Sequence, residues 1–212
     1  MATLAAVGDV AARHKDARAI VLLGKAALGR GLPLEHFAFP TAGIPHYRAI
    51  GPEVEPGIVY AIARQESSFN PRAISSARAV GLMQMTPAAG RYVANKFGAH
   101  YDEKRLLNDQ TYNVQLGAAE LGDLIKYYRG SYILSFAGYN AGRGRVKDWI
   151  AKYGDPRDPK IDPIDWVERI PLSETRNYVQ RVLENLQVYR VRFGSGSKLL
   201  IEADLRRGAS SK

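Results

Sequence analysis

The 212-residue sequence contains no cysteine. This absence excludes disulfide bonds and thiolate metal sites, and it fits either an oxidising or a reducing compartment. No stretch approaches the roughly 20 apolar residues that a membrane-spanning helix needs. The first residues also lack the basic segment, apolar segment and small-residue cleavage site of a signal peptide. We therefore expect either a cytoplasmic protein or one whose leader lies outside this sequence.

Acidic residues are fewer than basic ones: 21 Asp and Glu stand against 30 Lys and Arg, which gives a net charge of +9. This surplus favours a polyanionic partner such as nucleic acid, anionic lipid or an acidic wall polymer, but a dispersed solubilising charge explains it equally well. The basic residues form no tight block, and no RNA-binding, zinc-finger or clear helix-turn-helix motif is present. We therefore expect no nucleic acid partner.

The sequence shows no alternating strand pattern and no internal repeat. Its apolar residues recur at helical spacing, and with 46% of residues apolar the chain can build a core. We predict an all-α fold in which 1–50 form an N-terminal helix and linker, 51–193 the main domain and 194–212 a flexible tail. The expected helices span 11–28, 56–66, 87–97, 109–128, 131–137 and 173–193, with loops over 30–56 and 154–166.

A single carboxyl, Glu66, ends the helix expected over 56–66. Ile62 and Ile58 precede it by four and eight residues, so the three share one apolar face. A carboxyl held against apolar side chains loses solvation, and its pKa rises until it stays protonated near neutral pH. A protonated carboxyl is what a general acid for glycoside cleavage requires. The alternative is a structural glutamate at a helix C-terminus, a position that the helix dipole disfavours.

Two later segments carry polar side chains suited to binding a sugar. In "GLMQMTP" (81–87), Gln84 offers a donor and an acceptor to sugar hydroxyls, and Met83 offers adaptable apolar contact. In "GYNAGRGRV" (138–146), Tyr139 and Asn140 stand at a Gly-rich helix end, where they would form a pocket wall. Taken alone, a segment such as 81–87 more often serves core packing than sugar binding, and a segment such as 138–146 is more often a capped turn than a pocket wall.

Together these segments identify a family resemblance. "ARQESSFNPRAISSARAVGLMQMTP", "AGYNAGRGRVKDW" and "ERIPLSETRNYVQRVL" resemble, in order and spacing, the motifs of the soluble lytic transglycosylases. These are bacterial enzymes that cut peptidoglycan with a lysozyme-like domain related to goose-type lysozyme. The resemblance covers about 56–193, and 11–56 resemble the helix and connector that precede this domain in larger members. It implies that the chain is the C-terminal part of a longer, periplasmic protein whose upstream helical superhelix is absent here.

The resemblance also assigns candidate site residues. It implies that Glu66 is the single catalytic acid/base, and that the substrate-binding residues are Ser75 near the sugar's acetamido group, Met83 and Gln84 in one wall, Tyr139 and Asn140 beside the acid, and Glu174. One departure is Arg78, which stands where the family usually has glycine. The implied partner is the glycan strand of peptidoglycan, with peripheral association with the cell envelope, a monomeric state, and no cofactor or metal.

The implied mechanism needs one carboxyl, whereas ordinary glycosidases use two. Glu66 would protonate the bond between N-acetylmuramic acid and N-acetylglucosamine and then accept a proton from the muramic 6-hydroxyl, which closes a 1,6-anhydro ring without water. This reaction serves cell wall turnover in the family. Two alternatives stay open: a lysozyme-like hydrolase that delivers water, and a non-catalytic peptidoglycan-binding module.

Overall fold

The computed structural model describes residues 2–194, 196 and 198–209. Over these residues the all-helical prediction is confirmed, because they form helices and no β-strand. No helix within the described ranges is both long and apolar enough to cross a membrane. The elements are α1 (Ala2–Arg13), α2 (Ala17–Leu28), the 3₁₀ helix η1 (Glu35–Ala38), α3 (Pro56–Glu66), α4 (Pro87–Lys96), α5 (Glu103–Asn108), α6 (Gln110–Tyr127), α7 (Tyr132–Ala141), α8 (Arg143–Tyr153), α9 (Pro163–Glu168), α10 (Ser173–Arg192) and α11 (Ile201–Leu205).

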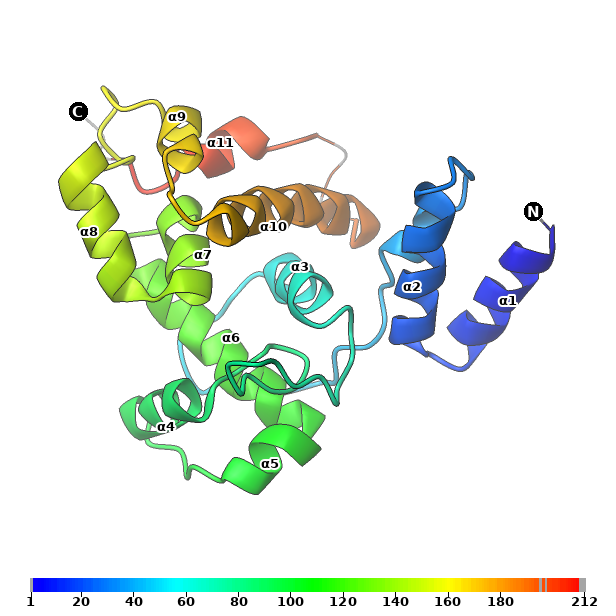
Figure 1. Cartoon of the computed structure of the whole chain (residues 1–212). Coiled ribbons are helices and arrows are strands. Elements are labelled where there is room, and N and C mark those ends of the chain that lie inside the picture. The colour runs from blue at the N-terminus through cyan, green and yellow to red at the C-terminus, as the bar shows by residue number, and fades with distance from the viewer. Residues whose placement is uncertain (1, 195, 197, 210–212) are drawn as a thin grey trace.

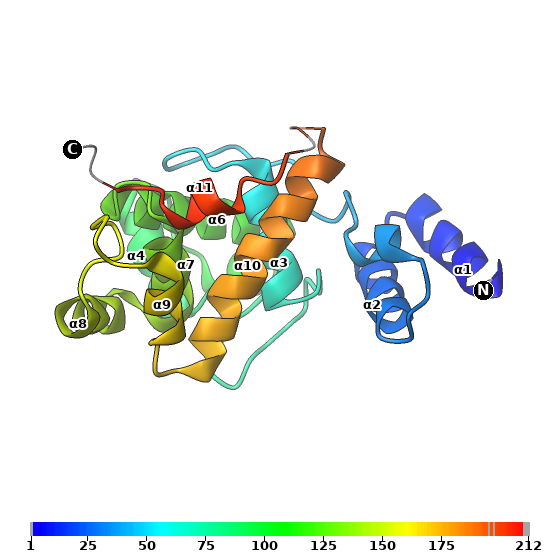
Figure 2. The same cartoon turned by 90° about the horizontal axis from the view of Figure 1, so that it is seen from above.

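The main body is built around α3. Figures 1 and 2 show the long helix α10 lying beside α3, with α6 and α7 next to them. The apolar faces of these helices meet in one core, whose fully buried residues include Ile62 of α3, Leu121 of α6, Phe136 of α7 and Leu186 of α10. Because α3 is covered by this core, its last turn is held in a fixed position.

Local sequence signals determine where several helices begin. Pro56 stands in the first turn of α3, where its missing N–H is not needed. The Thr86 side chain caps α4, and the Asp109 side chain caps α6 by accepting a hydrogen bond from the N–H of Tyr112. Ser131 caps α7 in the same way. Asp109 and Ser131, at which the helices expected over 109–128 and 131–137 begin, are therefore the N-caps of α6 and α7.

Three expectations about helices were wrong. The loop expected over 30–56 contains the 3₁₀ helix η1. The single helix expected over 11–28 is two helices, because Lys15 adopts a left-handed φ of 54° and the Asp16 side chain caps α2. The apolar spacing continues across this break and conceals it. The loop expected over 154–166 contains the start of α9, where Asp162 caps a helix that begins with Pro163. Trp166 of α9 is buried in the core.

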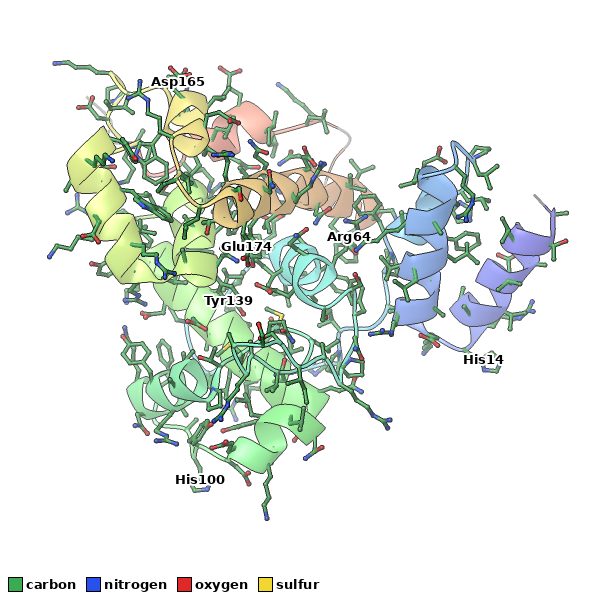
Figure 3. All side chains as sticks on the ribbon, viewed as in Figure 1. His14, Arg64, His100, Tyr139, Asp165 and Glu174 are labelled. Carbon is green, nitrogen blue, oxygen red and sulfur yellow. The ribbon has the colours of Figure 1, made fainter. Side chains whose placement is uncertain are left out.

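The N-terminal helices α1 and α2 stand to one side of the main body (Figures 1 and 2). With η1 they enclose a small apolar cluster of their own, which contains Ile20 and Phe37. Two hydrogen bonds fix this part to α3 and the turn that follows it. Arg64 Nε donates to the Ala38 carbonyl at 2.8 Å, and Lys25 Nζ donates to Ser68 Oγ at 2.7 Å. Figure 3 shows Arg64 on the side of α3 that faces α2.

The segment after α10 was expected to be a flexible tail, and 195, 197 and 210–212 lie outside the described residues. The described part contains α11, which packs on α10 and α7. Asp204 of α11 is 1% exposed and accepts hydrogen bonds from Arg190 and Gln187 of α10, and Arg190 also binds Glu55. These buried charges attach α11 to the main body.

We expect Asp204→Ala to lower the free energy of unfolding by about 2–3 kcal/mol, because it removes charge-assisted bonds and leaves Arg190 buried with one partner fewer. Equilibrium denaturant unfolding measures this change. Glu202→Ala is the matched control, since Glu202 is an exposed acid in the same helix and should change stability by less than about 0.5 kcal/mol. Equal effects of the two substitutions would contradict the buried network.

Candidate active site

Glu66 is the last residue of α3, and a sharp turn follows it. The N–H of Ser67 donates to the Ala63 carbonyl and closes the helix. Ser68 and Phe69 then adopt left-handed φ values of 49° and 57°, an unfavourable conformation for residues other than glycine. Burial of the Phe69 side chain, which is 3% exposed, holds this turn in place. Glu66 therefore lies at a fixed helix end.

The face of α3 that carries Glu66 points inward, as the sequence predicted. Ile58 and Ile62 on this face are fully buried, and Glu66 itself is half-buried. The hydroxyl of Tyr178, a buried residue of α10, donates a hydrogen bond of 2.7 Å to Glu66 Oε1. Sequence reasoning gave Tyr178 no role. A signal was present, because Tyr178 follows Glu174 by four residues and therefore lies on the same face of α10.

The pKa of the Glu66 carboxyl is raised from 4.5 to about 7. Burial is the largest cause, since a carboxylate is stabilised by water that the surrounding side chains displace. The hydrogen bond from Tyr178 favours the charged form and lowers the pKa, whereas the charges of Glu174 and Glu120 raise it. Near neutral pH a large share of Glu66 therefore carries a proton that it can donate.

One wall of the site is formed by the segment that contains Met83. The hydroxyl of Tyr139 donates a 2.8 Å hydrogen bond to the Met83 carbonyl, which ties α7 to this segment. The Met83 side chain is 0% exposed and packs on Gly117 of α6, where any larger residue would collide with it. Met83 thus supports the wall from behind, and a direct contact with substrate stays a prediction.

Gln84 and Ser75 hold the loop that leads to this wall. Gln84 has a left-handed φ of 47°, and its side-chain amide donates to the carbonyls of Ala73 and Gly81. The Ser75 hydroxyl accepts a hydrogen bond from the Ala79 N–H at 3.0 Å. Among the described residues, no hydrogen bond joins either side chain to Glu66. The structure therefore shows their part in shaping the loop, and their substrate contacts stay predictions.

Asn140 and Glu174 meet where α7 ends and α10 begins. Asn140 Nδ2 lies 3.5 Å from Glu174 Oε1, and the hydroxyl of Thr175 donates to Asn140 Oδ1 at 2.6 Å. Figure 3 shows Tyr139 and Glu174 on these neighbouring helices beside α3. A polar pocket of about 290 Å³ opens here, lined by Asn140, Ala141, Arg145, Leu172, Ser173, Glu174 and Thr175. The structure thus brings four predicted residues, Glu66, Tyr139, Asn140 and Glu174, into one region.

The site offers a protonated carboxyl, a phenol that donates to it, and amide groups for polar ligands. The pKa values of Tyr139 and Tyr178 are raised well above 10, mainly by burial and also by the charge of Glu66. Glu66 and these two phenols therefore interact electrostatically. In the part of the chain that the structure describes, no three His, Asp or Glu side chains gather in a way that would hold a metal ion. Proton transfer by Glu66 is the chemistry that these residues support.

We expect Tyr178→Phe to raise the pKa of Glu66 further, because the lost hydrogen bond favours the charged form. Infrared titration measures this pKa as the midpoint of the protonated-carboxyl band that Glu66→Gln removes. Tyr153→Phe, a substitution at the end of α8, should leave the midpoint unchanged. A midpoint that stays constant or falls in Tyr178→Phe would show that this bond does not act on Glu66.

Arg78 stands in a left-handed conformation with φ 61°, which explains why glycine suits this position. We expect Arg78→Gly to raise the free energy of unfolding by about 0.5–1 kcal/mol, because relief of backbone strain exceeds the added entropy of the unfolded chain. Denaturant unfolding is the measurement. Arg72→Gly, at an exposed position of the same loop without a positive φ, should be destabilising. A loss of stability in both variants would rule out strain at Arg78.

Comparison with known proteins gives consistent results. The family model described as "Transglycosylase SLT domain" matches residues 46–161. The soluble lytic murein transglycosylase of Escherichia coli K12 is 36% identical over 151 residues, which cover 71% of this chain and 23% of that protein. The membrane-bound lytic murein transglycosylase D of the same strain is 33% identical over 133 residues, which cover 60% of this chain and 28% of that protein.

Solved structures agree with the sequence matches. The crystal structure of the 70 kDa soluble lytic transglycosylase from E. coli superposes with a TM-score of 0.80 at 30% identity, and it covers 98% of this chain. The lysozyme-like fold expected from the sequence is thereby confirmed. The chain spans 23–33% of the length of these E. coli proteins. The motifs, the fold and the family match together show that this chain belongs to the SLT transglycosylase family.

Proposed function

We propose that the chain is a lytic transglycosylase that cleaves the β-1,4 bond between N-acetylmuramic acid and N-acetylglucosamine in peptidoglycan. The observation that carries this proposal is the Glu66 carboxyl, which is half-buried at the end of α3 and has a pKa of about 7. A general acid works best when its pKa lies near the working pH. The named relatives, which are lytic murein transglycosylases, support the same substrate class.

In the proposed first step, protonated Glu66 donates its proton to the glycosidic oxygen as the bond from the anomeric carbon of the muramic residue to that oxygen breaks. The acetamido group of the same sugar stabilises the positive charge at the anomeric carbon. In the second step, the Glu66 carboxylate accepts the proton of the muramic 6-hydroxyl while its oxygen attacks the anomeric carbon. The product is a 1,6-anhydro sugar and no water is consumed. Intramolecular attack has a high effective molarity, provided that the site holds the ring.

The other site residues are proposed to bind the glycan around Glu66. Tyr139 and Asn140 would line the site, and Glu174 would shape its entrance beside the polar pocket of about 290 Å³. Ser75, Met83 and Gln84 would form the wall that is tied to Tyr139 through the Met83 carbonyl, with Ser75 near the acetamido group. Among solved neighbours is an inactive glutamate-to-glutamine mutant of the transglycosylase Slt from Pseudomonas aeruginosa, so one glutamate is essential in that relative. Another solved neighbour is a complex of the 70 kDa soluble lytic transglycosylase with bulgecin A, so that relative binds a ligand.

The setting that fits this activity is the bacterial periplasm, where the chain would act on glycan strands during cell wall turnover. Association with the cell envelope would then be peripheral. Basic residues give the chain a charge of +9, and the carboxylates of peptidoglycan stems would draw it to the wall at low salt.

We expect Glu66→Gln to lower the release of anhydro-muropeptides from purified sacculi on the order of 10³-fold, because the amide cannot donate or accept the proton. Mass spectrometry of the released fragments measures this loss. Near wild-type release by Glu66→Gln would show that Glu66 is not the acid/base. Circular dichroism and a binding assay with sacculi confirm that the variant is folded and still binds.

A second candidate function is a hydrolase, and one observation favours it: a further carboxyl, Glu120, lies within electrostatic reach of Glu66. Hydrolases with two carboxyl groups use the second to activate water or to attack the sugar. The same digestion separates the two reactions, because hydrolysis leaves reducing ends that are heavier than anhydro ends by one water. Sacculi that are bound but not cut by the wild type would instead indicate a non-catalytic binding module.

A further inference from the structure

Helix α6 carries a carboxyl that the sequence analysis did not assign. Glu120 is half-buried, and its carboxyl makes no hydrogen bond or ion pair with the residues that the structure describes. Its neighbour Asp123 differs, because it is bound by Lys96 and Arg143. A half-buried carboxyl without a partner is unfavourable for folding, since lost hydration is not replaced. Its placement therefore calls for a functional explanation.

The packing of α6 places Glu120 beside the candidate active site. Gly117 precedes Glu120 by three residues, so the two lie on the same side of the helix. Gly117 packs against Met83, and the Met83 carbonyl accepts the hydrogen bond of Tyr139. Glu120 thus lies one helical turn beyond Gly117, on the side of α6 that contacts Met83 in the wall of the site.

Asp123, on the C-terminal side of Glu120, defines the position of Glu120 further. Asp123 follows by three residues and binds Arg143, the first residue of α8. Arg143 comes directly after the turn that ends α7 behind Asn140. Along α6, Glu120 therefore lies between the contact of Gly117 with Met83 and the ion pair of Asp123 with Arg143.

Several helices contribute charged or titratable groups around Glu120. Its own helix contributes Asp123, α8 contributes Arg143, α7 contributes Tyr139, and α10 contributes Tyr178. Helix α3 contributes Glu66, and α4 contributes Lys96, which binds Asp123. Burial and the charge of Asp123 raise the pKa of Glu120 to about 7, although Arg143 lowers it.

Glu66 receives a corresponding set of charges. On α10, Tyr178 donates to it and Glu174 opposes its charge; α7 contributes Tyr139, and α6 contributes Glu120. The pKa values of the two half-buried carboxyls, Glu66 and Glu120, are thus both raised to about 7, and the charge of Glu120 is one of the causes that raise the pKa of Glu66.

We propose that Glu120 is a second functional carboxyl of this site, which binds a polar group of the glycan beside Glu66 and holds a negative charge close to it. This inference rests on the proposed transglycosylase function. A carboxylate accepts hydrogen bonds only, so its partners are a sugar hydroxyl or an acetamido N–H, in which a glycan strand is rich. The charge of Glu120 disfavours loss of the proton from Glu66 and therefore extends to higher pH the range in which Glu66 is an acid.

Two substitutions separate these effects. Glu120→Gln keeps the shape of the side chain and removes its charge. The pKa of Glu66 should then fall, so the basic limb of the pH profile of anhydro-muropeptide release should move to lower pH, with little change in KM. Glu120→Ala also removes the contact, and KM should rise on the order of 10–100-fold, which corresponds to the loss of one hydrogen bond to a charged group. Glu103→Gln, an exposed acid of α5, is the matched control and should change neither quantity.

An unchanged pH profile in Glu120→Gln together with an unchanged KM in Glu120→Ala would overturn the proposal. Loss of all turnover in Glu120→Gln, with reducing ends among the wild-type products, would also overturn it, because Glu120 would then be the second carboxyl of a hydrolase. A readout without turnover keeps this test separate from the proposed function: in a ¹³C NMR titration of folded Glu120→Gln, the Glu66 carboxyl should titrate at lower pH than in the wild type. An unchanged Glu66 titration contradicts the proposal even if sacculi are not cut.

Discussion

The site depends on one constraint, the burial of the Glu66 carboxyl where α3 ends against α10. Two fully buried residues of the same face, Ile58 and Ile62, fix the helix in the core. Tyr178 of α10 then determines the orientation of the carboxyl through a hydrogen bond of 2.7 Å. Burial favours the neutral acid and the hydrogen bond favours the anion, so the pKa settles at about 7. A group in this balance can both give and take a proton near neutral pH, as a single acid/base must.

The rest of the fold serves this constraint. Helix α7 brings Tyr139 and Asn140 to the same region, and the loop before α4 is tied to α7 through the Met83 carbonyl. Left-handed residues, among them Phe69 and Gln84, recur in the turns between α3 and α4. Such conformations are unfavourable and persist only where the surrounding structure determines them, which is common at functional sites. The site is therefore held by packing that lies behind it.

Part of this arrangement could be predicted from the sequence. The spacing of Ile58, Ile62 and Glu66 predicted the inward face, because helical geometry relates residues four apart without tertiary information. The caps Asp109 and Ser131 were predictable for the same local reason. The break at Lys15 was not, since apolar spacing continues through it and the left-handed turn leaves no strong sequence signal.

The contacts between helices are the main feature of the site that the sequence did not predict. The bond from Tyr178 to Glu66 joins residues 112 positions apart, and no motif states which hydroxyl reaches which carboxyl. Glu120 was not predicted, because it lies outside the motif that contains Glu66 and no motif assigns it a role. Burial is likewise not visible in a motif: the side chain of Met83, which the motif assigned to a wall, is fully buried, and its contact with substrate stays a prediction.

The central claim is that burial raises the pKa of Glu66 so far that a large share of this carboxyl is still protonated near neutral pH. The most direct test is a ¹³C NMR titration of the glutamate carboxyls in the wild-type protein, with the Glu66 resonance assigned by its absence in Glu66→Gln. The account predicts a midpoint at about pH 7. A midpoint near the ordinary value of 4.5 would mean that Glu66 is ionised at neutral pH, and it would contradict the account.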